Sequence, residues 1–392
     1  MKIAISGAGV AGVALAHWLH RTGHTPTLIE RAPQFRTGGY VIDFWGLGYR
    51  VAERMGIETA IRDAGYPMRE LRLVDHEGRI GASVDVDAIR RATDGKYTSL
   101  TRGDLAAAIY GTIKDDVETI FGTSITAIEE HPHGVQVEFD TTPEREFDLV
   151  IGADGLHSAV RDLTFGPESR FEHYLGCVVA AFVVDGYAPR DELIYVTHNL
   201  PGRQVGRFSL RGNRTLFLFV FRSERISDVG DVTAAKARLR REFADAGWEC
   251  PQILAALDDV DDLYFDVVSQ IKMDRWSRGR ILLTGDAAAC VSLLAGEGTG
   301  LAITESYVLA GELARANNDY RGAFDAYEAR IRDLIEDKQV GARKFISFFT
   351  PRTRLGIRTR NAAMRALKIR PVADLLLAHT LVDHFELPYY TI

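Results

Sequence analysis

Residues 2–12 of this 392-residue chain read KIAISGAGVAG, and this stretch decides the fold. The apolar run at residues 2–6 predicts a short strand, which leads directly into a GxGxxG pattern. Residues 13–21 continue with helical apolar spacing until Thr22-Gly23 ends them. In such a unit the first glycine permits the turn, the second lets backbone approach a pyrophosphate, and the third lets helix and strand pack. The helix N-terminus then faces the negative charge of a bound nucleotide.

A second strand, predicted at residues 27–30, ends in Glu30, 18 residues after Gly12. This is near the spacing at which a carboxylate binds a ribose hydroxyl, and the charge would repel a 2′-phosphate. The alternative is an ordinary surface acid at a strand end. The combined pattern favours an adenosine diphosphate of the FAD or NAD kind.

Two later passages repeat the strand-then-turn layout. Residues 146–161 read EFDLVIGADGLHSAVR, and residues 282–300 read LLTGDAAACVSLLAGEGTG, followed by a helix predicted at about residues 301–314. Asp286, at a predicted strand end, can accept hydrogen bonds from ribityl or ribose hydroxyls. A dehydrogenase whose nucleotide site is complete by residue 30 has no obvious use for either passage.

Together these motifs carry a family resemblance. GAGVAG with Glu30, Arg102 in LTRGDL, VIGADGLHSAVR and LLTGDAAACVSLLAGEGTG resemble, in order, the motifs of the class A FAD-dependent monooxygenases, the aromatic hydroxylase family. They span about residues 1–310. The chain length, the LAGEGTGLA passage and a long helical tail are most similar to the tetracycline-inactivating branch of that family.

The resemblance implies an α/β fold, in which a glutathione-reductase-type Rossmann FAD-binding domain accompanies a β-sheet substrate domain and a C-terminal helical segment. The expected FAD-binding domain comprises residues 1–70, 101–170 and 275–318, and the expected substrate domain comprises residues 71–100 and 171–274. Residues 319–392 are expected to form helices that bridge the two domains.

The resemblance also implies FAD as cofactor, with its adenosine half at the first glycine loop and Glu30. Arg102 and Asp286 are expected at its ribityl and pyrophosphate centre. Backbone amides of residues 295–300 would lie beside the flavin pyrimidine, where a helix dipole stabilises the negative charge of reduced flavin. The full expected cofactor set is Gly7, Gly9, Ala11, Gly12, Glu30, Arg31, Arg102, Asp154, Asp286, Gly296, Gly298 and Thr299. For Arg102 the alternative is a solvated side chain on a helix capped by Thr101 and Asp104.

The chain departs from the family pattern after Gly285-Asp286. Ala289 stands where the family usually has His, Ser292-Leu293 replaces Pro-Pro, and Gly300 replaces a common Asn. These departures bear on flavin tuning and loop rigidity more than on binding itself.

Stretches of strand character at residues 70–86, 177–184, 192–198, 206–210 and 215–221 predict a mixed or antiparallel substrate sheet. The expected substrate-lining residues are Tyr40, Phe44, Arg207, Phe208 and Phe219. The alternatives are that the alternating phenylalanines at 217, 219 and 221 form core, and that residues 36–48 are a packed strand with a glycine-rich exit.

Residues 320–349 predict one long helix that Pro351 ends. Residues 351–370 carry arginines and lysine with no acid among them. We expect them to be the solvated face of a helix pair at the substrate entrance, and contact with an anionic membrane surface is the alternative.

The net charge and the cysteine content limit the kinds of partner and of metal site that we expect. A formal net charge of −7 disfavours nucleic acid as a partner. Three dispersed cysteines, at 177, 250 and 290, argue against a disulfide framework or a zinc site, so we expect no metal and a cytoplasmic location. A monomer or a homodimer is expected.

The resemblance implies an FAD-dependent monooxygenase that consumes NADH or NADPH and dioxygen. A flavin C4a-hydroperoxide would hydroxylate an aromatic, phenolic or enolic small molecule, such as a polyketide or a tetracycline. No dedicated acid, base or nucleophile is evident. The alternatives are a flavin-dependent dehydrogenase or reductase without oxygen insertion, and a flavin- or drug-binding protein without turnover. A halogenase is disfavoured because the WxWxIP signature is absent.

Overall fold

The structure is a computed structural model that describes residues 1–36, 39–226, 230–317, 319–367 and 385–391. Its first sheet has six strands and contains the glycine-rich passages. Their order is β17 (Ser277–Arg278), β18 (Ile281–Leu283), β11 (Leu149–Gly152), β1 (Lys2–Ser6), β2 (Thr25–Glu30) and β7 (Glu118–Phe121). All pairs are parallel except β17 with β18. The apolar residues of β1 and β11 are fully buried, as expected for a parallel sheet covered on both faces.

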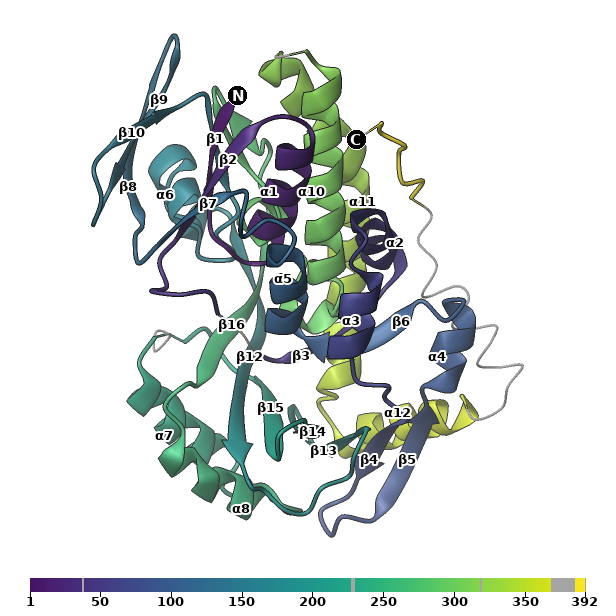
Figure 1. Cartoon of the computed structure of the whole chain (residues 1–392). Coiled ribbons are helices and arrows are strands. Elements are labelled where there is room, and N and C mark those ends of the chain that lie inside the picture. Colours follow the sequence, from purple (N-terminus) through teal and green to yellow (C-terminus); the bar gives the residue numbers. More distant parts are fainter. Residues whose placement is uncertain (37–38, 227–229, 318, 368–384, 392) are drawn as a thin grey trace.

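Helices cover this sheet. α1 (Val10–Arg21) and α10 (Gly298–Arg315) lie side by side, with α5 (Arg102–Tyr110) packed against α1 (Figure 1). α6 (Ala159–Phe165) packs against β11, β18 and a three-stranded meander of β8 (Ile125–His131), β9 (Gly134–Phe139) and β10 (Arg145–Phe147). Short elements complete this part: α2 (Gly46–Met55), α3 (Glu58–Ala64), α9 (Asp286–Ala289), η1 (Glu168–Arg170) and η3 (Leu293–Ala295).

The second large sheet has seven strands. Their order is β16 (Tyr264–Ile271), β12 (Glu172–Asp185), β15 (Arg214–Arg222), β14 (Arg203–Leu210), β13 (Ile194–Leu200), β4 (Glu70–Val74) and β5 (Ile80–Asp85). Only β13 and β4 pair in parallel, so the sheet is mixed. Its outer face is covered by α7 (Val232–Glu242), α8 (Cys250–Ala255) and η2 (Ala256–Asp259). Its inner face meets a two-stranded ribbon of β3 (Val41–Trp45) and β6 (Tyr97–Thr101), and α4 (Asp87–Ala92) precedes β6.

The predicted long helix is confirmed as α11 (Tyr320–Phe349), which runs along α10 (Figure 1). Its buried residues Phe324, Tyr327, Ile331 and Ile335 recur every three or four positions, which gives one apolar stripe. α12 (Arg354–Ala366) follows and packs against β5. Within the basic stretch Arg360 is buried and donates to Asn199 Oδ1, whereas Arg352, Arg354 and Arg358 are exposed. Lys368 and Arg370 lie outside the described residues.

The α/β fold class is confirmed, while the domain boundaries stay predictions. In the described part of the chain no helix combines the length and the apolar character needed to cross a membrane. The three cysteines are free and buried. No group of three or more potential metal ligands occurs among the described residues.

Candidate active site

The first glycine loop is a turn that only glycine can form. Gly7 has φ +100°, and a Cβ there would lie 2.7 Å from the carbonyl oxygen of Ala153. A Cβ on Gly12 would lie 1.9 Å from the carbonyl oxygen of Gly7. At Gly9, by contrast, a Cβ would meet only Arg102 Nη2, at 3.8 Å. Gly7 and Gly12 therefore build the turn, and Gly9 keeps space free in front of the helix.

Three motifs that are far apart in sequence meet at this loop. A Cβ on Gly285 would lie 3.1 Å from Cβ of Ala11 in α1 and 3.7 Å from Cβ of Ala302 in α10. Neither helix has a side-chain cap on its first amides. Two uncapped helix N-termini thus lie on either side of the Gly285-Asp286 turn, an arrangement suited to an anionic group.

Glu30 is fixed by the same loop. Its Oε2 accepts from the backbone N–H of Ala8 at 2.9 Å, and its Oε1 accepts from that of Ala32 at 2.8 Å. Each oxygen keeps a further lone pair for a ribose hydroxyl. The side chain of Glu30 is therefore held in a fixed position by backbone N–H groups at the end of β2. Arg31, next to it, is exposed.

Arg102 lies between the first loop and the late turn. Thr101 Oγ1 accepts from the N–H of Asp104 at 3.0 Å, so the predicted cap exists. Arg102 is nevertheless half-buried, and the nearby Tyr40 hydroxyl and then the Asp286 carboxylate raise its pKa. The oxygen Oδ1 of Asp286 would be 3.7 Å from a Cβ on Gly298. The structure thus brings together Gly9, Arg102, Asp286 and Gly298.

The buried carboxyl of Glu305 accepts hydrogen bonds that hold the Gly285-Asp286 turn in place. Glu305 Oε2 accepts from the N–H of Gly285 at 2.9 Å and from the hydroxyl of Tyr327 at 2.9 Å. Burial raises the pKa of Glu305 to about 7. This contact ties α10 and α11 to the turn that carries Asp286.

Asp154 turns into the protein. Its Oδ1 accepts from Ser158 Oγ at 2.5 Å, and its Oδ2 accepts from Ser6 Oγ at 3.3 Å and from the N–H of Val160 at 3.2 Å. Burial raises the pKa of this carboxyl. Asp154 therefore holds the turn after β11 in place, and its role as a cofactor contact stays a prediction. The neighbouring Arg161 is fully buried and donates to the carbonyl oxygen of Ala287, which links this turn to α9.

His157 joins the turn after β11 to the seven-stranded sheet. Its Nε2 lies 3.1 Å from Asp266 Oδ1 on β16, and its Nδ1 lies 3.1 Å from both oxygens of Glu168. Hydrogen bonds to Asp266 and then to Glu168 raise the pKa of His157 to about 10. At neutral pH the imidazole is therefore a cation held between two carboxylates.

We expect the stabilising effect of His157 to depend on pH. Because its pKa is higher in the folded than in the unfolded chain, the stabilisation is full below the unfolded value of 6.5 and is lost as pH rises through about 10. Chemical denaturation of wild type and His157→Gln should differ most near the unfolded value of 6.5 and converge above pH 10. A difference that does not change with pH would show that the imidazole is not a paired cation.

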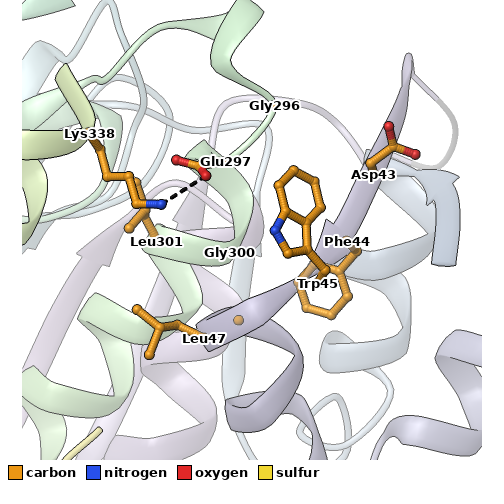
Figure 2. Close-up of a pocket in the computed structure, with 10 residues that line it drawn as sticks. Asp43, Phe44, Trp45, Leu47, Gly296, Glu297, Gly300, Leu301 and Lys338 are labelled. Atoms are coloured by element: carbon orange, nitrogen blue, oxygen red, sulfur yellow. Dashed lines mark hydrogen bonds and ion pairs between the residues drawn. The ribbon is translucent and has the colours of Figure 1, made fainter. Parts of the chain in front are cut away.

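The glycine-rich loop before α10 borders a pocket. Gly296, Glu297, Gly300, Leu301 and Lys338 face β3 and the start of α2 across it (Figure 2). Remaining lining residues are Asp43, Phe44, Trp45, Leu47 and Gly48. A Cβ on Gly48 would lie 2.4 Å from Cα of Gly300, so the two backbones are in close contact. Thr299 lies in the first turn of α10.

The loop before α10 has a backbone conformation at Ser292 that proline, the usual residue of the family at this position, could not adopt. Ser292 has φ 151°, far from the value near −65° to which a proline ring is restricted. Its Oγ accepts from the N–H of Leu294 at 3.3 Å. A proline at position 292 could therefore not adopt the backbone conformation that Ser292 has here.

The predicted substrate-lining residues do not all face one cavity. Phe208 lies on the inner face of the sheet with Tyr66, at a ring distance of 5.3 Å. Arg207 is its neighbour on β14, so it points to the outer face, where it pairs with Asp191 and Glu249. Phe219 packs on the outer face against Phe243 of the helical cover. Arg207 and Phe219 therefore cannot line a cavity with Phe208, and the core alternative holds for Phe219.

The other two predicted residues lie at the junction of the sheets. Tyr40 is 5.7 Å from Tyr264, centroid to centroid, on the inner face. Phe44 is buried against Tyr49, and only part of it borders the pocket, where the ring of Trp45 stands (Figure 2). Sequence reasoning missed Asp43, Tyr97, Tyr264 and Asp266, because each reaches the junction from a strand without a recognisable motif.

The residues present fit an FAD molecule. The open space at Gly9, the fixed carboxylate of Glu30, the two uncapped helix starts and the neighbouring side chains of Arg102 and Asp286 would suit a dinucleotide bound between β2 and the pocket. A guanidinium at uncapped helix starts is the donor set that a pyrophosphate requires.

The chain is similar in sequence and in fold to known flavoproteins. The sequence profile of a family described as "FAD binding domain" matches residues 1–338. A flavin-dependent monooxygenase of Legionella longbeachae is 35% identical over 351 residues, which cover 86% of this chain and 87% of that protein. The crystal structure of tetracycline destructase Tet(55) is 31% identical, with a TM-score of 0.85 over 99% of this chain and 98% of that one. Klebsiella pneumoniae R204Q HpxO complexed with FAD is 25% identical, with a TM-score of 0.77 over 96% and 99% of the two chains.

The match extends over most of the chain and includes every glycine-rich passage. The chain therefore belongs to the class A FAD-dependent monooxygenases, the aromatic hydroxylase family, and its cofactor is FAD.

Proposed function

We propose that this monooxygenase uses NADH or NADPH to insert one oxygen atom of dioxygen into a phenolic or enolic ring compound. The observation that carries the proposal is the junction of the two sheets. There the loop before α10 faces β3 across a pocket, beside the aromatic inner face of the seven-stranded sheet.

The chain's own residues have distinct tasks in this proposal. Glu30 and the loop of Gly7, Gly9 and Gly12 would hold the adenosine half of FAD, and Arg102 with Asp286 would hold its centre. Gly296 and Gly298 lie at the uncapped start of α10, where amides and the helix dipole stabilise negative charge on a ring. Bound FAD supplies the electron transfer and the oxygen activation.

The inner face of the sheet supports an aromatic substrate. Tyr40, Trp45, Tyr195, Phe208 and Tyr264 belong to one cluster at the junction. Aromatic side chains bind flat ring compounds through offset stacking and exclude water from the reacting centre. The likeness to tetracycline destructases favours polycyclic phenol-enols such as tetracyclines as the first substrates to test.

The test is NADH and NADPH oxidation in air by FAD-loaded protein, with phenols, polyketides and tetracyclines added singly. We expect one class to accelerate NAD(P)H oxidation and to yield a product heavier by one oxygen atom. Peroxide release should fall with that substrate, because oxygen is then coupled to product. Flavin reduction without an oxygenated product from any compound would contradict oxygen insertion. A bound flavin that neither nicotinamide reduces would contradict the choice of reductant.

Asp286→Ala should weaken FAD binding about 10- to 100-fold, since a hydrogen bond to a charged group is worth about 1.5–3 kcal/mol. The dissociation constant can be measured by quenching of flavin fluorescence. Asp286→Asn is the matched variant, and it should retain part of the affinity because one acceptor oxygen remains. Wild-type affinity in the alanine variant would show that Asp286 does not contact the cofactor.

A further inference from the structure

The end of α11 and the start of α12, residues 340–358, form a corner that exposes large apolar side chains. Phe345 and Phe348 of α11 are 42% and 39% exposed, and Leu355 of α12 is 70% exposed. The two phenylalanine rings stack, with their centroids 5.6 Å apart. Because α11 packs on the protein through Ile346, its two phenylalanines lie on the face that points away from the core. Exposed apolar side chains that gather in one place mark an interaction surface, whereas scattered ones do not.

The α11–α12 corner is also strongly basic. Residues 338–367 contain eight Lys and Arg and no Asp or Glu, although the whole chain has a formal net charge of −7. The exposed cations of the corner include Lys344, Arg352, Arg354 and Arg358. In the described part of the chain none of these four forms an ion pair. Neighbouring carboxylates among those residues therefore do not neutralise the charge that surrounds the exposed rings.

The α11–α12 corner is held firmly on the protein. α12 follows α11 and packs against β5 (Figure 1). Arg222 Nε donates to the carbonyl oxygen of Thr350 at 3.0 Å, and Arg360 Nη1 donates to that of Phe348 at 3.3 Å. The guanidinium of Arg360 also lies 5.9 Å from the centroid of the Phe348 ring. Side chains of the sheet and of α12 thus satisfy carbonyl groups at the end of α11, and the exposed ring of Phe348 is ordered before any partner binds.

We propose that the α11–α12 corner binds the surface of an anionic lipid bilayer. The rings of Phe345 and Phe348 would enter the boundary between headgroups and acyl chains, and the surrounding cations would contact the lipid phosphates. Each Lys or Arg near an anionic membrane surface strengthens binding about 5-fold, and the rings add the burial of apolar area. The contact is peripheral, and it requires no change in the fold.

The composition of the α11–α12 corner fits a lipid surface better than an acidic protein. The central part of a protein–protein interface is depleted of charged residues, and lysine is rare there. Helices that lie on membranes instead combine Lys and Arg with Phe and Leu. The corner has this second composition, because unpaired cations stand directly beside the stacked phenylalanines. Mobile lipid headgroups can also follow long cationic side chains without a fixed set of complementary acceptors.

The main test is sedimentation of the FAD-loaded full chain with vesicles. One set consists of phosphatidylcholine alone, and the other is an equimolar mixture of phosphatidylcholine and phosphatidylglycerol. We expect binding to the mixed vesicles that falls as salt is raised, because counterions screen charges at a surface. Binding to neither set at low salt would overturn the proposal, and so would equal binding to both.

Four variants locate the contact on the protein. Phe345→Ser and Arg354→Ala should each lower the partition coefficient for mixed vesicles about 5-fold, and both should retain FAD. Leu163→Ser is the matched control for the ring, because Leu163 is 45% exposed on α6. Arg50→Ala is the control for the cation, since Arg50 is exposed on α2. Both controls should bind vesicles like the wild type. Equal binding by all four variants would place the contact elsewhere and refute the proposal.

Entry of the rings into the bilayer is tested separately. Phe345→Trp places an indole at the α11–α12 corner, and lipids with brominated acyl chains should quench its fluorescence on mixed vesicles. Leu163→Trp should show only the quenching of the native tryptophans, which are the same in both variants. Vesicle binding with equal quenching in the two variants would show that the rings stay outside the bilayer. A wild-type dimer that Phe345→Ser dissociates, without any vesicle binding, would show that the corner binds a second copy of the chain instead.

Discussion

Gly12→Ala is expected to yield a protein without bound FAD whose free energy of unfolding is lower by about 3 kcal/mol, the upper part of the range for overpacking. The added Cβ would lie 1.9 Å from the carbonyl oxygen of Gly7 and 3.0 Å from its carbonyl carbon. Both are backbone atoms of a tight turn, so no side chain can move to relieve the clash. The strand β1 and the helix α1 would have to separate. Urea denaturation and the flavin absorbance of the purified protein measure the two effects.

Two further glycine variants, neither of which creates a backbone clash, are controls for the effects of Gly12→Ala. Gly9→Ala adds a Cβ whose nearest neighbour is Arg102 Nη2 at 3.8 Å, so stability should be unchanged while FAD affinity falls. Gly341→Ala, in the middle of α11 with nothing within 4 Å, should raise stability by about 0.5–1 kcal/mol. Retention of FAD by both Gly9→Ala and Gly12→Ala would contradict the placement of the dinucleotide at this loop.

The parts of the fold that sequence predicted well depend on local chemistry. Lys2–Ser6 is a strand and α1 follows it, because glycines at three fixed positions leave the backbone no other route. The bounds of α11 agree with the prediction, since a continuous apolar stripe and Pro351 define the helix from within. Glu30 and Asp286 could be chosen for the same reason, as each follows a short apolar strand.

The parts that sequence could not predict depend on contacts between distant segments. Alternation shows that Arg207 and Phe208 point to opposite faces of β14, but it cannot show which face α7 and α8 cover. That is decided by packing of residues such as Phe243, 24 positions beyond Phe219. Asp43 and Tyr97 are 54 positions apart, and only the β3–β6 pairing makes them partners. The candidate site is therefore predictable where it binds the nucleotide and unpredictable where it meets the substrate.

Arg161→Ala is expected to lower the free energy of unfolding by about 3–5 kcal/mol, the cost of breaking a buried ion pair. Its guanidinium is fully buried and donates to the carbonyl oxygens of Ala287 at 2.9 Å and Leu156 at 2.6 Å, and to Glu168 Oε2 at 2.9 Å. Truncation would leave two carbonyl groups without a donor. Because Ala287 follows Asp286 directly, the turn that we propose to hold the centre of FAD should loosen, and FAD affinity should fall together with stability.

Arg79→Ala is the matched control for this loss. Arg79 forms ion pairs with Asp75 and Glu77, but its side chain is 68% exposed, so water replaces the contacts and denaturation should show no resolvable change. Arg161→Lys keeps the charge but loses the planar fork that reaches three acceptors, so it should be intermediate in stability and in FAD affinity. Equal denaturation midpoints for the Arg161 and Arg79 alanine variants would show that the buried guanidinium does not hold the two turns together. Unchanged FAD affinity in a destabilised Arg161→Ala protein would instead separate folding of the turn after β11 from cofactor binding at Asp286.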